Sequence, residues 1–289
     1  MIVGNKGVKT EIVRVASWGG YSWLRHGFST RGGGVSSVYG GNSLNLGWTK
    51  EDDPTSVGEN RRRFLSECCG SALDETDFQM VTLKQVHSGL AIPIRQEVGI
   101  WQGKLQTADG KAVLEGDGSM TDVPGVMLGI QTADCVPVLV ADVEKRVVAA
   151  FHAGWRGTVA RIAEHGIQQM QREYGSHPED LVAAVGPSIG VCCYAVGDEV
   201  RSGFRAQFGY AEQLFRTADQ GKMHLDLWEA NRRQLLDSGI PSERITVVGE
   251  CTACARNERG ERKYFSHRAE HGFTGRMMSA VGVARSGIK

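Results

Sequence analysis

Three strongly apolar runs lie within residues 125–153, and they constrain the fold more than any other feature of the chain. GVMLGIQT and VPVLVAD are separated only by the polar turn ADC, and RVVAAFHA follows shortly afterwards. The third run leads through the glycine-rich turn GWRG into TVARIAEHGIQQMQREYG, whose apolar residues recur at helical spacing. We therefore expect a buried strand, a tight turn and an amphipathic helix here, after two further apolar strands.

The rest of the chain predicts a similar alternation of strands and helices. One helix is expected after Asp53, which can cap it, with Pro54 at its first position and Gly70 at its end. A second is expected between Asp226 and Gly239. Further strands are expected in FQMVTLKQVHS, LVAAVG, ITVVGE, KYFSH and MSAVGVA. Because several strands are adjacent while others alternate with helices, we predict an α/β fold with a mixed sheet, in one catalytic domain over residues 1–289.

Charge and hydropathy argue against two classes of partner. The 33 Lys and Arg residues balance 33 Asp and Glu residues, and the one strong basic cluster, residues 61–63, falls in a predicted helix, so we expect no nucleic acid. No run of 18 apolar residues occurs, so we expect no membrane span. The N-terminal segment lacks the apolar core of a signal peptide, and the cysteines number seven, so we expect reduced thiols in the cytoplasm.

The segment CTACARNERGERKYFSHRAEH has the spacing of a zinc finger, C-x2-C-x12-H-x3-H. Its four possible ligands are Cys251, Cys254, His267 and His271. A finger also needs a small apolar core, and here the interval carries Glu258 and Gly260 where apolar residues would be wanted. We therefore predict that these four residues bind no metal, and that the two cysteines flank a turn after the ITVVGE strand.

A second motif, GPSIG, matches the G-x-S-x-G pattern of a hydrolase nucleophile elbow. It follows a predicted strand, but the next residues, VCCYAVGDEV, are not an obvious helix, and Pro187 fixes the backbone directly before Ser188. We interpret Ser188 as part of a turn that lines a pocket rather than as a nucleophile.

Three potential metal ligands occur where predicted strands end. His87 closes LKQVHSG, Cys135 lies in the turn of QTADCVPV, and His152 precedes the helix in AAFHAGWRGT. Two imidazoles and a thiolate suit tetrahedral Zn²⁺ and leave one position open, as in catalytic sites. The alternative, that these are packed residues at strand ends, stays open because the three are 48 and 17 residues apart.

HAGWRGT also has features of an anion site. Gly154 and Gly157 allow close approach of the backbone, and a helix expected to start near Thr158 would direct free N–H groups at the turn. Arg156 could donate two hydrogen bonds to a phosphate or carboxylate. A plain glycine turn with a surface arginine is the alternative.

Taken together, several segments closely resemble one family, known as multicopper polyphenol oxidase (laccase-like), peptidoglycan editing factor and zinc-dependent purine nucleoside phosphorylase. The segments are SLNLG, GENRRRF, KQVHS, GDGSMTDVPGVMLGIQTADCVPVLVAD, FHAGWRGT, GPSIGVCCYAVGDEV and FSHRAEHGFTGRM. The resemblance extends from about Gly27 to Val283 and is most specific from TADC to HAGWRGT. His267 stands where the family commonly has tyrosine, so the finger spacing looks accidental.

The resemblance implies a compact fold of layered mixed β-sheets flanked by helices, similar to a toxin-like Cys-His deamidase. It implies that His87, Cys135 and His152 hold the metal and act in catalysis. The substrate and phosphate residues expected in the matching segments are Asn45, Arg61, Gln85, Arg156 and Ser188. Asp134 could orient a ribose hydroxyl or relay a proton, or it could cap a turn.

Three activities follow from the resemblance. The first is zinc-dependent phosphorolysis of adenosine, inosine, guanosine or methylthioadenosine to base and ribose 1-phosphate, with adenosine deamination as a further activity, although the H-x-E…P-C-x-x-C deaminase signature is absent. The second is cleavage of an amide in a peptidoglycan precursor with Cys135 as nucleophile. The third is copper-dependent polyphenol oxidation, which the sequence supports least, because it offers one three-ligand site and no H-x-H cluster.

Overall fold

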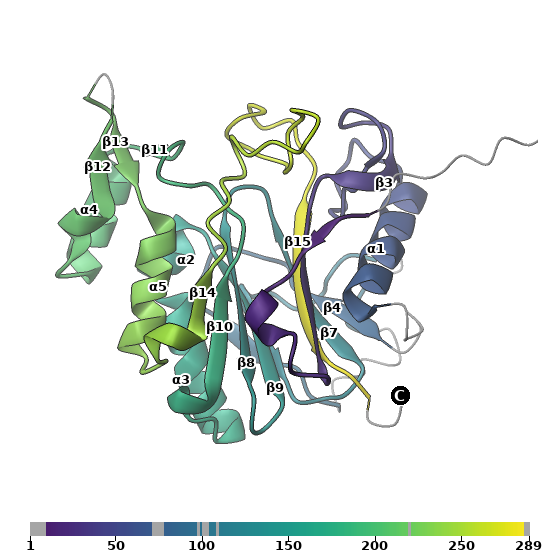
Figure 1. The fold of residues 1–289 in the computed structure, drawn as a ribbon, viewed down its shortest axis with the longest axis horizontal. Coiled ribbons are helices and arrows are strands. Elements are labelled where there is room, and N and C mark those ends of the chain that lie inside the picture. Colours follow the sequence, from purple (N-terminus) through teal and green to yellow (C-terminus); the bar gives the residue numbers. More distant parts are fainter. Residues whose placement is uncertain are drawn as a thin grey trace, which may run out of the picture.

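The computed structural model describes residues 10–70, 78–96, 99, 104–107, 110–218 and 221–285 (Figure 1). In these ranges a five-stranded sheet has the order β1-β2-β15-β7-β4, and a six-stranded sheet has the order β14-β10-β8-β9-β6-β5. The strands of the first are Ile12–Val13, Leu24–Ser29, Met277–Val283, Val126–Thr132 and Gln79–Thr82, in that order. Those of the second are Ile245–Val247, Leu181–Val185, Val136–Asp142, Val147–Ala153, Gly118–Thr121 and Ala91–Pro93.

The two sheets pack face to face because their central strands are apolar on both faces. In β8, Leu139 and Ala141 join a core with Leu128 of β7 and Val281 of β15, whereas the alternate residues of β8 face the other way. Successive side chains of a strand point to opposite faces, so a fully apolar strand needs a layer on each side. The buried runs at residues 125–153 are therefore the contact between the sheets.

Helices cover the outer face of each sheet, which gives four layers (Figure 1). Helix α1, Pro54–Cys69, buries Phe64 and Cys68 against the first sheet. Helices α3, Ile162–Tyr174, and α5, Leu227–Asp237, pack on the second. The remaining elements include strand β3 (Gly32–Ser36) and helices α2 (Trp155–Val159) and α4 (Asp198–Gln207). Short helices occupy Ala16–Trp18, Pro178–Asp180, Ala211–Leu214 and Ser242–Arg244. A small third sheet has the order β11 (Ala195–Val196), β13 (Met223–Leu225) and β12 (Phe215–Thr217). The prediction of an α/β fold with layered mixed sheets is confirmed.

Three local predictions need correction. KYFSH is a loop, and its strand-like pattern arises because Tyr264 and Phe265 are both buried. The strand expected in FQMVTLKQVHS ends at Thr82, so a loop carries His87. The helix expected near Thr158 begins earlier, at Trp155, and a residue in left-handed conformation, Arg161, separates α2 from α3.

No helix in the described ranges combines the length and the apolar character that crossing a bilayer requires.

Candidate active site

His87, Cys135 and His152 converge, as the sequence predicted. Their ligand atoms all lie within 4.8 Å of one another, and the two imidazole rings are in edge contact with centroids 4.9 Å apart. The pairing of β8 with β9 explains two of the positions: Val136 is opposite Ala153, so Cys135 and His152 come to the same end of the sheet. His87 arrives from the loop after β4, in a left-handed conformation with φ 63°.

Asp117, fully buried, organises this group, and sequence reasoning missed it. One carboxylate oxygen lies 2.8 Å from Nδ1 of His152, and the carboxylate also accepts hydrogen bonds from the backbone amides of Val86, His87 and Ser88. Although burial opposes ionisation, His152 and Ser88 hold the pKa of Asp117 well below its usual range. The only sequence signal was an aspartate between two glycines in GDGSM, directly before a strand.

The charges of the two central side chains depend on each other. Burial opposes ionisation of Cys135, but His152 and His87 outweigh it and lower its pKa to about 6. Burial likewise opposes protonation of His152, but Cys135 and Asp117 outweigh it and raise its pKa to about 9. Without a metal, the pair is therefore a thiolate beside an imidazolium near neutral pH.

Gly154 is needed for close packing around the thiol. A Cβ atom at this position would lie 2.9 Å from the Cys135 sulfur, which is closer than carbon and sulfur can approach without movement. At Gly157 a Cβ would lie 3.0 Å from the carbonyl oxygen of His152. The glycines of HAGWRGT therefore make room for the Cys-His group.

The three residues line a cavity of about 720 Å³, which is within the range of small-molecule sites. Aromatic side chains, amides and cations share the wall with them. The other lining residues are Trp48, Leu83, Lys84, Gln85, Lys111, Ala112, Gln131, Thr132, Ala133, Asp134, Ile189, Tyr194, His267, Arg268 and Arg276. Apolar faces with several cations suit an aromatic ligand that accompanies an anion.

Two of the other predicted residues line this cavity. Gln85 exchanges hydrogen bonds with the backbone of Gln131, at 2.8 Å each. Asp134, with φ 95°, accepts hydrogen bonds at both carboxylate oxygens, from the Thr252 hydroxyl and the Arg268 amide, each at 2.7 Å. Both donors come from distant loops, so the carboxylate joins these loops to its turn, and both of its oxygens are engaged in structural contacts.

The remaining predicted residues lie behind the wall or away from it. Asn45 and Ser188 are fully buried; Asn45 accepts a hydrogen bond from the Arg276 amide, and Ser188 accepts one from Trp228. Arg61 donates to the Leu46 carbonyl and stacks on the lining residue Trp48.

Arg156 does not line the cavity. Its side chain is 56% exposed, lies over Trp155 and comes within 3.7 Å of Glu199.

Arg268 and Arg276 are two of the cavity cations that sequence reasoning passed over, beside Lys84 and Lys111. Arg268 donates to the Ala195 carbonyl and lies over the ring of Tyr194. Arg276 donates to two neighbouring carbonyls of its own loop. Both belong to FSHRAEHGFTGRM, where the finger spacing drew attention to the histidines instead.

The zinc-finger arrangement itself does not form. His267 lines the cavity, whereas Cys251 and Cys254 gather with Cys192 and Cys193.

A family model described as multi-copper polyphenol oxidoreductase laccase matches residues 25–284. The chain belongs to this family. It is 40% identical over 261 residues to a purine nucleoside phosphorylase of Deinococcus radiodurans, which covers 90% of this chain and 89% of that protein. It is also 35% identical over 229 residues to the adenosine deaminase RL5 of an unknown prokaryotic organism, which covers 78% and 84% of the two chains.

Solved structures agree with this assignment. The crystal structure of the hypothetical protein YfiH from Bacillus licheniformis superposes with a TM-score of 0.81 at 32% identity, covering 96% of this chain and 97% of that one. YlmD from Geobacillus stearothermophilus gives 0.77 at 34% identity, covering 92% and 93%. The family predicted from the motifs is therefore confirmed, and relatives named as nucleoside enzymes support an enzymatic role.

Proposed function

We propose that the chain is a zinc-dependent purine nucleoside phosphorylase, which converts adenosine, inosine or guanosine and phosphate into free base and ribose 1-phosphate. The observation that carries this proposal is the His87–Cys135–His152 group in the wall of a cavity that also contains aromatic and arginine side chains. The names of relatives that align over most of the chain support it.

The residues fit a zinc ion by their chemistry. Two imidazoles and one thiolate form a three-ligand set, and Asp117 engages Nδ1 of His152, which leaves the other ring nitrogen for a metal. When bound, zinc would supply a Lewis acid that stabilises negative charge in the cavity. Asp117 fixes the orientation of the His152 ring and, through the adjacent amides, the loop of His87.

The cavity walls would bind and orient the two substrates. In phosphorolysis a phosphate oxygen attacks ribose C1′, the bond from C1′ to the base nitrogen breaks, and the departing nitrogen takes up a proton. Arg268 and Arg276 place positive charge where a phosphate could lie, and the rings of Trp48 and Tyr194 offer faces for a purine. Holding both reactants in one cavity lowers the entropic part of the barrier.

The test is release of base from adenosine and inosine, with and without phosphate, followed by chromatography. Phosphorolysis requires phosphate and gives ribose 1-phosphate; equal release without phosphate identifies a hydrolase and contradicts the proposal. Arg276→Ala should lower kcat/KM for phosphate roughly 10- to 150-fold, since a charge-assisted hydrogen bond is worth about 1.5–3 kcal/mol. Arg156→Ala is the matched control, because Arg156 is the candidate from sequence and lies outside the cavity wall. A loss confined to Arg156→Ala would move the phosphate site out of the cavity.

Adenosine deamination is the second candidate, because one relative is named an adenosine deaminase. It predicts conversion of adenosine to inosine and ammonia without phosphate. The same samples also test the remaining alternatives. Copper rather than zinc in the purified protein would favour polyphenol oxidation. Cleavage of a peptidoglycan-precursor amide by metal-free protein, lost in Cys135→Ala, would favour the thiolate as a nucleophile.

A further inference from the structure

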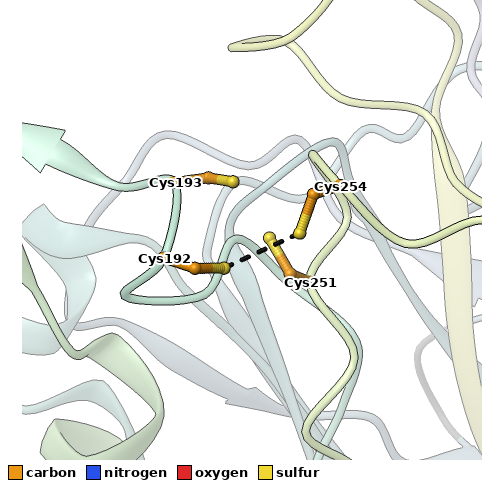
Figure 2. Close-up of side chains that lie close together, drawn as sticks. All are labelled: Cys192, Cys193, Cys251 and Cys254. Carbon is orange, nitrogen blue, oxygen red and sulfur yellow. Dashed lines mark hydrogen bonds between the residues drawn. The ribbon is translucent and has the colours of Figure 1, made fainter.

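Four cysteine side chains from two separate turns meet beside the second sheet, and none is among the residues that line the cavity (Figure 2). One turn precedes β11 and the other follows β14. The cysteine cluster consists of Cys192, Cys193, Cys251 and Cys254, whose sulfur atoms all lie within 4.8 Å of one another. Cys192 and Cys254 are exposed, so an ion can reach the cluster from solvent.

The sulfur positions are close to those of a tetrahedral thiolate site. A zinc–sulfur distance of about 2.3 Å sets the sulfur–sulfur edge of a tetrahedron at about 3.8 Å. The Cys192 and Cys254 sulfurs are 3.7 Å apart, already at this distance. The other pairs must close by about 1 Å at most, which small rotations of side chains on a turn can provide.

The backbone holds the two turns together before any ion binds. Cys251 forms a parallel bridge with Ser188, and the Gly190 amide donates a hydrogen bond to the Cys251 sulfur at 3.2 Å. Each turn is also closed on itself: the Cys193 amide donates to the Gly190 carbonyl, and the Ala255 amide donates to the Cys251 carbonyl. An amide hydrogen bond to sulfur stabilises the thiolate form that ligates a metal.

We propose that the cysteine cluster binds one Zn²⁺ ion through its four thiolates, as a closed structural site. Four sulfur ligands with tetrahedral spacing select zinc over the oxygen-loving cations, and full coordination leaves no position for substrate. The thiol protons pass to solvent as the ion binds. This site replaces the expectation, drawn from sequence, that Cys251 and Cys254 flank a turn without metal.

The bound ion would hold one wall of the cavity in place. The Ile189 amide donates to the Asp134 carbonyl at 2.9 Å, and the Thr252 hydroxyl donates to the Asp134 carboxylate. Tyr194, directly after Cys193, lines the cavity. Joining the two turns through zinc therefore restrains the turn that carries Cys135, and the cluster acts as a positioning element rather than in catalysis.

The test uses the full chain with Cys135→Ala, which removes the thiolate of the other site. Its readout is metal absorption rather than turnover, so the test does not depend on the proposed phosphorylase activity. Metal-free protein, kept reduced under inert gas, is titrated with Co²⁺, whose tetrathiolate complexes absorb strongly through sulfur-to-metal charge transfer. We expect one equivalent with this absorption and its displacement by one equivalent of Zn²⁺. Adding Cys192→Ser and Cys254→Ser should abolish the absorption, while His267→Ala and His271→Ala should leave it unchanged.

Three results would overturn the proposal: no charge-transfer band, a band that survives the serine substitutions, or a band lost with the histidines. A second measurement does not need the serine variants, whose loss of the band could result from misfolding alone: it follows the protection of thiols by zinc. In the Cys135→Ala protein, zinc should shield four thiols from an aromatic disulfide reagent, and a chelator should expose them again. A Cys192–Cys254 disulfide in the reduced preparation, found by mass spectrometry, would also contradict the thiolate site.

Discussion

The His87–Cys135–His152 group and the cysteine cluster both bring potential metal ligands together, but different parts of the fold hold them. Strand pairing places two members of the first group, and a buried carboxylate holds the third through its loop. The second group depends on two turns joined by a bridge and a few amides. The first has three ligands and faces a cavity, whereas the second has four ligands and faces solvent. An incomplete ligand set on a rigid frame suits catalysis, and a complete set between turns suits stabilisation.

The largest expected effect separates the two groups by stability. An ion that binds only the folded chain stabilises it by about 2.7 kcal/mol when its free concentration is a hundred times its Kd. Cys192→Ser combined with Cys254→Ser should therefore lower the zinc-dependent gain in unfolding free energy by about this amount, while one equivalent of zinc stays at His87, Cys135 and His152. Urea unfolding with and without a chelator measures the gain. An equal chelator effect in the variant would show that the cluster adds nothing.

The second effect concerns the carboxylate that only the first group possesses. Asp117→Asn removes the charge that orients His152, and losing such a partner costs about 10- to 100-fold in metal affinity or activity. Asp142→Asn is the matched control, because Asp142 is equally buried and accepts amide hydrogen bonds from Glu144 and Lys145 at the far end of β8. Competition with a chromophoric chelator gives the affinities. Similar losses in both variants would reduce Asp117 to a stabilising residue.

The third effect distinguishes the thiols by pH in metal-free protein. Cys135 has its pKa lowered to about 6, so its thiolate forms well below the usual range and is lost as the pH falls through that value. His152 has its pKa raised to about 9, so its charge is complete below its unfolded pKa of about 6.5 and is lost as the pH rises through 9. Both side chains are charged between about pH 6 and about pH 9, so the thiolate–imidazolium pair stabilises the fold most in that window.

By contrast, burial and the neighbouring Cys251 and Cys254 thiols raise the pKa of Cys192 to about 11. Alkylation followed residue by residue in a mass spectrometer should show Cys135 reacting with a midpoint near pH 6, and Cys192 still gaining reactivity above pH 9. His152→Ala should move the Cys135 midpoint upward. Identical profiles for the two cysteines would remove the electrostatic difference between the groups.

The comparison also shows what the sequence could predict. Apolar runs and strand ends located Cys135 and His152, since strand pairing brings such ends together, whereas His87 lies on a loop five residues beyond the end of its strand. Asp117 escaped notice because its role depends on a loop that folds over it from another part of the chain. KYFSH was misread because two buried aromatic residues in a loop have the same pattern as a short strand.

The cysteine cluster was missed for a related reason. Cys251 and Cys254 have histidines at finger spacing along the chain, so sequence reasoning considered only that set of partners and rejected it because the interval lacks an apolar core. The actual neighbours come from a turn on the adjacent strand of the second sheet, because β14 pairs with β10. A motif counted along one segment cannot register a partner that sheet pairing supplies.

The smallest expected effect tests whether the histidines at finger spacing belong to the cysteine cluster. His267 lines the cavity and His271 lies in a tight turn with φ 51°, and neither joins the cysteine cluster. His267→Ala should therefore change KM for the nucleoside, because it alters the cavity wall, and leave two equivalents of zinc bound. His271→Ala should change neither KM nor metal content. Elemental analysis of the two variants, side by side with Cys251→Ser, measures this directly. If His267→Ala lost one equivalent as Cys251→Ser is expected to, the finger ligands would be the true set, and the contrast between a three-ligand site in a cavity and a closed site of four thiolates would fail.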